Sequence, residues 1–142
     1  FVMNDKCAAG TGKFLELTAK IFELEIDQIG DFALKSTKNV SISSICAVFA
    51  ESEVISLISQ GALEADIING IHNSIGEKIY GMANRLQFKE KVMFCGGVAN
   101  NVGMIRTIRT IFQLEDIYIP PEVQNIGAMG AALFAAQPKE RK

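Results

Sequence analysis

The stretch MNDKCAAGTGKFLE, residues 3–16, places a cysteine directly before a loop of small residues and the start of a helical pattern. Three chemistries are compatible with this order: a phosphate cradle, a reactive thiol or a metal ligand. A complete phosphate-loop motif is missing, because Phe14 stands where Ser or Thr would follow Lys13. Free backbone N–H groups and the helix dipole would still favour a nearby anion here. A plain tight turn is the alternative.

The composition limits the classes of protein to consider. A length of 142 residues and a hydrophobic fraction of 49% are enough for one domain with its own core. A net charge of -2 without a basic stripe argues against nucleic acid as a partner. We expect no membrane association, because the longest low-charge run, residues 126–137, is too short to span a bilayer and no signal peptide is visible. Three cysteines do not make a secreted disulfide framework, so we expect a cytoplasmic protein.

Patterns of apolar residues predict helices alternating with strands, and therefore an α/β layer fold. Helices are predicted over residues 12–24, 51–60, 64–86, 102–112 and 124–136. Strands are predicted at residues 1–3, 91–95 and 116–119, and strand-like alternation opens residues 40–50. Within residues 27–38, Gly30 is expected to break the pattern. The longest helix carries the clearest apolar seam, made of Ile68, Ile71, Ile75, Ile79, Met82 and Leu86.

Two further stretches are rich in glycine. In FCGGVANN, residues 94–101, a predicted buried strand ends in Gly96 and Gly97, whose backbone could approach a ligand closely. Ligands of open α/β sheets lie at such carboxyl ends of strands, although a simple strand-to-helix turn is also possible. In IGAMGAALFAA, residues 126–136, one helix face carries only small residues. We expect that face to pack closely against another helix.

The three cysteines differ in their surroundings. Cys95 lies in a predicted strand and is expected to be a small buried hydrophobic residue. Cys7 follows polar residues in a turn, and Cys46 stands between polar and apolar neighbours. His72, the single histidine, is expected on the polar side of its helix, in a solvated or capping role. One chain therefore lacks four metal ligands, whereas a two-fold axis would bring together four thiolates, an arrangement that the spacing alone leaves open.

The order and spacing of four stretches resemble a known family. They are MNDKCAAGTGKFLE, SSICAVFAESEVISL, FCGGVANN and NIGAMGAALFAA. Together they are similar to the ATP-dependent activators of 2-hydroxyacyl-CoA dehydratases and to the ATPase subunits of benzoyl-CoA reductase. The resemblance implies the α/β, ribonuclease-H-like fold of actin, sugar kinases and heat-shock chaperones. Residues 1–142 would form a truncated C-terminal lobe, with the N-terminal lobe absent.

The resemblance also implies the ligands of an iron–sulfur cluster. Cys7 and Cys46 would each ligate a [4Fe–4S] cluster that two subunits of a homodimer share. Gly10, Thr11 and Gly12 would cradle this anionic cluster, with the helix dipole behind them. The resemblance thus implies that the small-residue loop after Cys7 holds an iron–sulfur cluster rather than a phosphate.

A second implied site binds the nucleotide. Gly96, Gly97 and Asn100 would form an adenosine loop for ATP or ADP with Mg²⁺. ATP binding and hydrolysis would drive one electron from reduced ferredoxin or flavodoxin to an acyl-CoA dehydratase or reductase. Because the family's phosphate loops lie upstream of Phe1, we expect weak nucleotide binding and no ATP hydrolysis by this chain alone, and the catalytic residue remains unassigned.

Two other functions stay open. The chain could serve an ATPase that donates electrons to another type of enzyme. It could also be a non-catalytic interaction module of actin-like fold whose cysteines are structural.

Overall fold

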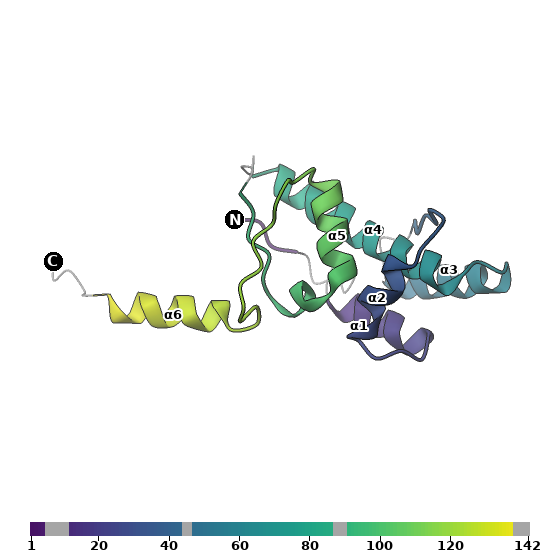
Figure 1. Cartoon of the computed structure of the whole chain (residues 1–142), viewed down its shortest axis with the longest axis horizontal. Helices are drawn as coiled ribbons and strands as arrows, with labels where there is room; N and C mark the ends of the chain where they lie inside the picture. The colour runs from purple at the N-terminus through teal and green to yellow at the C-terminus, as the bar shows by residue number, and fades with distance from the viewer. Residues whose placement is uncertain (5–11, 44–46, 87–90, 138–142) are drawn as a thin grey trace.

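The computed structural model describes residues 1–4, 12–43, 47–86 and 91–137, and within these ranges the chain is mostly helical. The helices are α1 Gly12–Ile21, α2 Gln28–Leu34, α3 Ala47–Ser59, α4 Glu64–Asn84, the 3₁₀ helix η1 Gly97–Asn100, α5 Val102–Ile111 and α6 Ile126–Ala136. Figure 1 shows α1 to α5 gathered into one body, from which α6 extends.

The long helix α4 is the centre of this body, and both α2 and α5 pack against it. Its predicted seam is confirmed over Ile68, Ile71 and Ile75, which are at most 2% exposed. The seam leaves the core further along, since Leu86 lies beyond the end of the helix and is exposed. The 3.6-residue period thus located the main packing surface correctly in the first half of α4.

One core joins four helices. Its buried members include Phe14 and Leu15 of α1, Ala50 and Val54 of α3, Ile67, Ile71 and Ile75 of α4, and Met104 and Ile108 of α5. Helices α1 and α3, which begin shortly after Cys7 and Cys46 in the sequence, therefore bury their apolar faces in the same cluster. Burial of such side chains is the main source of folding free energy.

Two boundaries near the start of the chain differ from those predicted. Helix α1 ends at Ile21 rather than at residue 24, because Glu23 adopts a left-handed backbone with φ of 54° and starts a turn. Gly30 lies inside α2 and does not break it. It is instead a packing position, since a Cβ at Gly30 would lie 2.8 Å from Oδ1 of Asn101.

The predicted strands are wrong within the described residues. Residues 91–95 and 116–119 form a single parallel bridge, between Met93 and Tyr118. Residues 1–3 and 40–43 join no ladder, and the part of residues 40–50 from Ala47 onward belongs to α3. A pair of short segments without further strands is at most marginally stable, so strand propensity alone did not produce a sheet.

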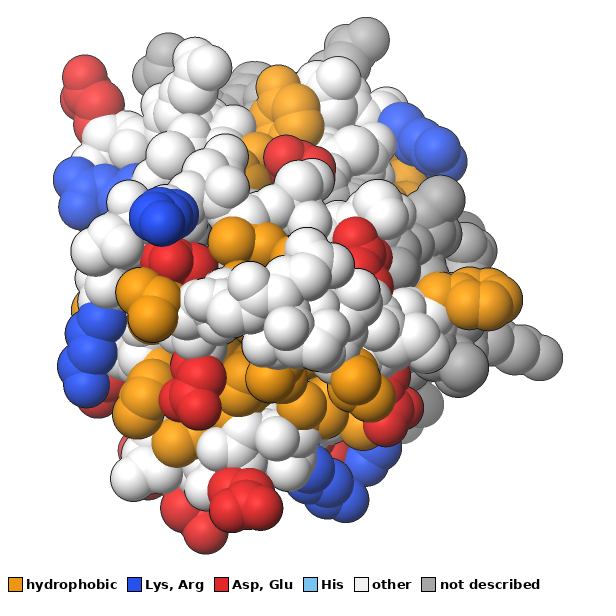
Figure 2. All heavy atoms as spheres, turned by 90° about the vertical axis from the view of Figure 1, so that its right-hand side faces the viewer, with side chains coloured by type: hydrophobic (Ala, Val, Ile, Leu, Met, Phe, Trp, Pro, Cys, Tyr) orange, Lys and Arg blue, Asp and Glu red, His pale blue; other side chains and the backbone are white. Residues whose placement is uncertain are grey.

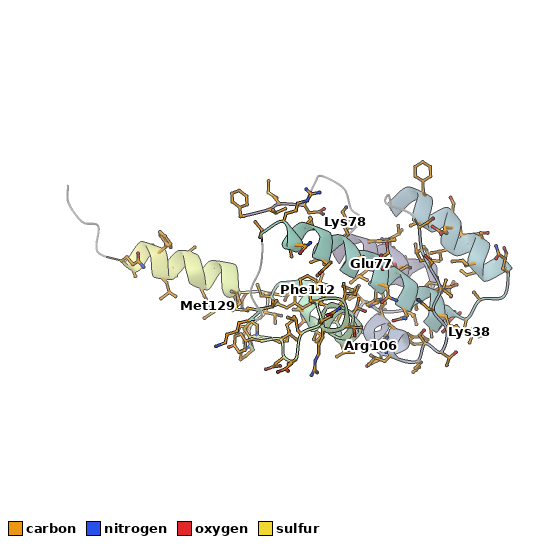
Figure 3. The ribbon with its side chains drawn as sticks, turned by 90° about the horizontal axis from the view of Figure 1, so that it is seen from above. Lys38, Glu77, Lys78, Arg106, Phe112 and Met129 are labelled. Atoms are coloured by element: carbon orange, nitrogen blue, oxygen red, sulfur yellow. The ribbon has the colours of Figure 1, made fainter. Side chains whose placement is uncertain are left out.

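Helix α6 does not pack as expected. None of its residues is buried, and a Cβ at Gly127 or Gly130 would meet nothing within 4 Å. Figure 3 shows α6 extending away from the body of the molecule, and Met129, labelled near the start of this helix, is 52% exposed. The predicted close packing of the small-residue face is therefore not found.

The surface mixes charged and apolar side chains. Figure 2 shows exposed hydrophobic side chains among charged ones on the end that faces right in Figure 1. Helix α3 contributes exposed apolar residues, with Phe49 71% and Ile55 56% exposed. Among the helices within the described ranges, none is both long and apolar enough to cross a membrane.

Candidate functional site

The second glycine loop is built around a backbone conformation that favours glycine. Gly96 has a φ of 91°, in the left-handed region that other residues rarely adopt. Its N–H donates a hydrogen bond of 2.7 Å to the carbonyl oxygen of Val123, and its carbonyl accepts one from the N–H of Ala99. These bonds hold η1 against the segment that precedes α6.

Asn101 ends this loop and begins α5. Its side-chain Oδ1 accepts the N–H of Met104 at 2.9 Å, which is the hydrogen bond of a helix N-cap. The side chain is 8% exposed and has a second neighbour, Nε2 of His72, at 3.0 Å. The loop is thus fixed at both ends, by Val123 before it and by the α5 cap after it.

A cavity of about 600 Å³ lies between this loop and α1. Its size falls in the range of ~300–1,000 Å³ that is typical of small-molecule sites. Its lining consists of Gly12, Leu15, Glu16, Ile26, Asp27, Gly97, Val98, Asn100, Asn101 and Gln124. The structure therefore brings Gly12, Gly97 and Asn100 together, although they were predicted to belong to two separate sites.

Small residues allow the walls of the cavity to approach each other. A Cβ at Gly12 would lie 3.2 Å from Cγ2 of Val98, and a Cβ at Gly97 would lie 3.3 Å from Nε2 of Gln124. Both distances are shorter than ordinary carbon contacts, so larger side chains would displace these walls.

The cavity is lined by acidic and amide groups together with an apolar part. Glu16 forms an ion pair of 2.7 Å with Lys13, and this hydrogen bond and charge hold the pKa of Glu16 below its ordinary value. The Asp27 carboxylate stands before α2 without a side-chain capping bond. Apolar side chains from Leu15 and Ile26 lie beside these polar groups. Such a lining suits a ligand with hydroxyl donors and a flat apolar part.

A larger hollow of about 810 Å³ lies elsewhere, along residues 91–93 and 112–118. None of the predicted site residues that the structure describes lines it. It borders the isolated Met93–Tyr118 bridge. We therefore take the smaller cavity as the candidate site, because only it combines glycine loops with convergent polar groups.

Several predicted site residues lie outside the described ranges. They are Cys7, Gly10, Thr11 and Cys46. Within the described ranges, no group of three or more His, Cys, Asp or Glu side chains could hold a metal ion.

Two expectations about single residues are wrong. Cys95 is exposed, and among the described residues its segment forms a bridge only with residues 116–119. His72 is fully buried, at 0% exposure, and its Nδ1 lies 2.7 Å from the carbonyl oxygen of Ile68. Burial lowers the pKa of His72, and the positive charge of Arg106 adds to this effect, while the contacts with Ile68 and Asn101 oppose it.

Of the ten residues that line the cavity, only Gly12, Gly97 and Asn100 were predicted as site residues from the sequence. Asn101 could have been found, because an Asn directly before an apolar periodic segment is a typical N-cap signal. The positions of Glu16, Asp27 and Gln124 follow only from how α1, α2 and the segment before α6 meet. No local motif marks them.

Comparisons with known proteins agree with the resemblance. Residues 1–135 match the sequence profile of the BadF/BadG/BcrA/BcrD ATPase family. The chain is 48% identical, over 135 residues, to the (R)-2-hydroxyglutaryl-CoA dehydratase activating ATPase of Acidaminococcus fermentans, covering 95% of this chain and 52% of that protein. It is 33% identical to one of the subunits of the benzoyl-CoA reductase from Thauera aromatica, covering 96% of this chain and 50% of that protein.

The fold is also similar to that of a solved dehydratase activator. The activator of the 2-hydroxyisocaproyl-CoA dehydratase from Clostridium difficile with bound ADPNP superposes with a TM-score of 0.88 at 45% identity. The match covers 95% of this chain and 50% of that one. The chain thus spans about half the length of the curated relatives it matches.

Proposed function

We propose, from the premise that this chain belongs to the BadF/BadG/BcrA/BcrD ATPase family, that it serves as the cluster-bearing lobe of an ATP-dependent activator of a 2-hydroxyacyl-CoA dehydratase. The lobe would have the ribonuclease-H-like fold of actin and sugar kinases. It would act in the cytoplasm as part of a homodimer. The names of the most similar relatives support this choice of partner enzyme.

One observation carries the proposal: a single cavity is lined by Gly12, Gly97 and Asn100. Gly12 begins α1, five residues after Cys7 in the sequence, whereas Gly97 and Asn100 belong to the proposed adenosine loop. A nucleotide in this cavity would touch the helix that follows Cys7. Nucleotide binding in the cavity would therefore shift the position of α1 and, through it, affect the cluster held by Cys7.

The cavity residues suggest how an adenine nucleoside would be held. Carboxylates of Glu16 and Asp27 are suited to accept hydrogen bonds from the two ribose hydroxyls. The base would lie against apolar side chains such as Ile26. Backbone at Gly97 would approach the sugar, because no Cβ stands in the way. The phosphate groups of the nucleotide, with Mg²⁺, would be bound by the family's phosphate loops, outside this cavity.

We assign the iron–sulfur ligands to Cys7 and Cys46. In the sequence, α3 begins directly after Cys46, and α1 begins soon after Cys7. A helix N-terminus stabilises a thiolate, and Gly10 and Thr11 would add backbone N–H donors. Two subunits would supply four thiolates to one [4Fe–4S] cluster, which provides one-electron redox chemistry when bound.

The proposed reaction moves one electron per step. Reduced ferredoxin or flavodoxin would give the electron to the activator dimer, and the acyl-CoA dehydratase would accept it. ATP and water would become ADP and phosphate in the full-length protein. This chain would contribute the cavity that holds the nucleoside and the two cysteine ligands. The groups that bind the phosphates would come from other parts of the family's fold.

The direct test is iron content after anaerobic purification and cluster reconstitution. We expect iron in the unmodified chain, loss of iron in Cys7→Ala and in Cys46→Ala, and unchanged iron in Cys95→Ala. The last variant is the matched control, because Cys95 is an exposed thiol outside the proposed site. Loss of iron in Cys95→Ala with retention in Cys7→Ala would contradict the assignment.

A second candidate partner is a benzoyl-CoA-reductase-like enzyme, favoured by the similarity to the benzoyl-CoA reductase component from Thauera aromatica. The two candidates differ in the electron acceptor. An assay with each acyl-CoA enzyme would separate them, since only the true partner should be reduced in an ATP-dependent manner.

A further inference from the structure

We propose that His72 is a positioning residue for the nucleotide cavity. Its Nε2–H would donate to Oδ1 of Asn101 and so hold the cavity wall formed by residues 97–101. This inference rests on the nucleotide-binding function proposed above. It gives a role to a buried titratable group that otherwise has none.

His72 on α4 contacts Asn101, which lines the cavity. Nε2 of His72 lies 3.0 Å from Oδ1 of Asn101, and both residues are buried. Asn101 lines the cavity and also caps α5 through the N–H of Met104. Movement of the His72 ring would therefore be transmitted to the loop that carries Gly97 and Asn100.

The capping bond determines which nitrogen of His72 carries the proton. The Asn101 atom near Nε2 must be the amide oxygen, because the same atom accepts the N–H of Met104. An amide oxygen can accept two hydrogen bonds, so we assign an N–H to Nε2, 3.0 Å away. The carbonyl oxygen of Ile68 faces Nδ1 in the same way, but a neutral ring has only one N–H to give.

A second proton on the ring is disfavoured. Burial lowers the pKa of His72, and the guanidinium of Arg106 on α5 acts in the same direction. Rotation of the Asn101 amide would offer its Nδ2, which has no partner within the described residues, to a ring protonated on Nδ1. That rotation would take the acceptor away from Met104. Keeping the α5 cap therefore favours the Nε2–H form of His72.

Packing leaves little room for another arrangement. A Cβ at Gly103 would lie 3.1 Å from Nε2 of His72, and one at Gly30 would lie 2.8 Å from Oδ1 of Asn101. Arg106, labelled in Figure 3, donates hydrogen bonds to the carbonyl oxygen of Ala33 at 2.9 Å and to Asn69, which ties α5 to α2 and α4. Asn101 also lines the cavity.

The first test is nitrogen NMR of the imidazole. Because the chain has one histidine, the ring signals belong to His72 without ambiguity. We expect a proton on Nε2 and none on Nδ1 at neutral pH. A proton on Nδ1 alone would overturn the inference, and this measurement needs neither a variant nor a nucleotide.

The second test uses two matched variants. His72→Gln keeps a donor near the position of Nε2 and loses the contact with Ile68, whereas His72→Asn keeps a donor near Nδ1 and loses the one toward Asn101. We expect His72→Gln to retain ADP affinity within about twofold and His72→Asn to lose about five- to tenfold, the equivalent of one hydrogen bond. Thermal unfolding of both variants measures the structural cost separately.

The outcomes separate this inference from the proposed function. Equal ADP affinity in the two variants, with the unmodified chain binding ADP, would overturn the role of His72 alone. Failure of the unmodified chain to bind ADP would overturn the proposed nucleotide site, and the inference with it. If both variants fail to fold, the NMR result still decides.

Discussion

Gly12 at the start of α1 and Val98 in η1 pack so closely that a Cβ on Gly12 would lie 3.2 Å from Cγ2 of Val98. This contact joins the helix that follows Cys7 to the loop proposed to bind adenosine. It is the point at which the two proposed sites meet.

The contact can be tested with a double-mutant cycle. Gly12→Ala should push η1 outward and weaken adenine-nucleotide binding by roughly threefold, and Val98→Ala in the same chain should restore much of the loss. Calorimetry on the two single variants and the double variant gives the coupling. Strictly additive effects would show that the two walls do not influence each other.

Two glycines of α4 should respond in opposite ways to alanine. A Cβ at Gly70 would clash with the carbonyl oxygen of Val40, so Gly70→Ala should destabilise the fold by ~1–3 kcal/mol. Gly81 has nothing within 4 Å, so Gly81→Ala should stabilise the same helix by about 0.5–1 kcal/mol. Urea unfolding measures both. A neutral Gly70→Ala variant would mean that the Val40 carbonyl does not lie against Gly70.

Asp66 should make the fold sensitive to acid. Oδ1 of this buried residue accepts the N–H groups of Thr37 and Lys38, at 2.7 and 2.9 Å, and the hydroxyl of Ser36. The bond from Lys38 is the strongest influence that holds the pKa of Asp66 below its ordinary value. Because the folded pKa is depressed, this stabilisation is present above about pH 4, the unperturbed range, and is lost as the pH falls through the folded pKa.

We therefore expect Asp66→Asn to unfold at lower temperature than the unmodified chain at pH 7. The difference should shrink as the pH falls below about 4. Thermal unfolding across this range is the measurement. A difference that stays constant with pH would show that the carboxylate charge is not involved.

His72 should add a second dependence on pH in a higher range. Its pKa is lowered in the fold, mainly by burial, so the folded state binds fewer protons than the unfolded chain. Stability should therefore fall as the pH drops from about 6.5, the unperturbed value, toward the folded pKa. His72→Gln removes this titration and should flatten the profile. An unmodified chain that gains stability over this range, relative to His72→Gln, would contradict the buried neutral state.

Sequence patterns predicted the packing of α4 well because its apolar period is continuous. The same period could have located His72, since it lies four residues after Ile68 and three before Ile75, on the buried face. The expectation that His72 lies on the polar side of the helix was therefore wrong. A buried histidine is compatible with an apolar face when its nitrogens have partners.

The strands and α6 could not be predicted in the same way. The apolar run in residues 91–95 is suited to a buried strand, but the number of neighbouring strands decides whether a sheet forms. Residues 126–136 are apolar on all sides, so no period selects the face that packs. The cavity was predicted only in part, because Gly12 and Gly97 are marked by motifs and Asp27 and Gln124 are not.

The central claim is that one cavity links the proposed nucleotide site to α1, the helix that follows Cys7 in the sequence. Its most direct test is the electron paramagnetic resonance spectrum of the anaerobically reconstituted, reduced protein during titration with ADP. We predict that the cluster signal changes shape and saturates at the same ADP concentration as binding measured by calorimetry. ADP that binds with the same affinity but leaves the cluster signal unchanged would contradict the account.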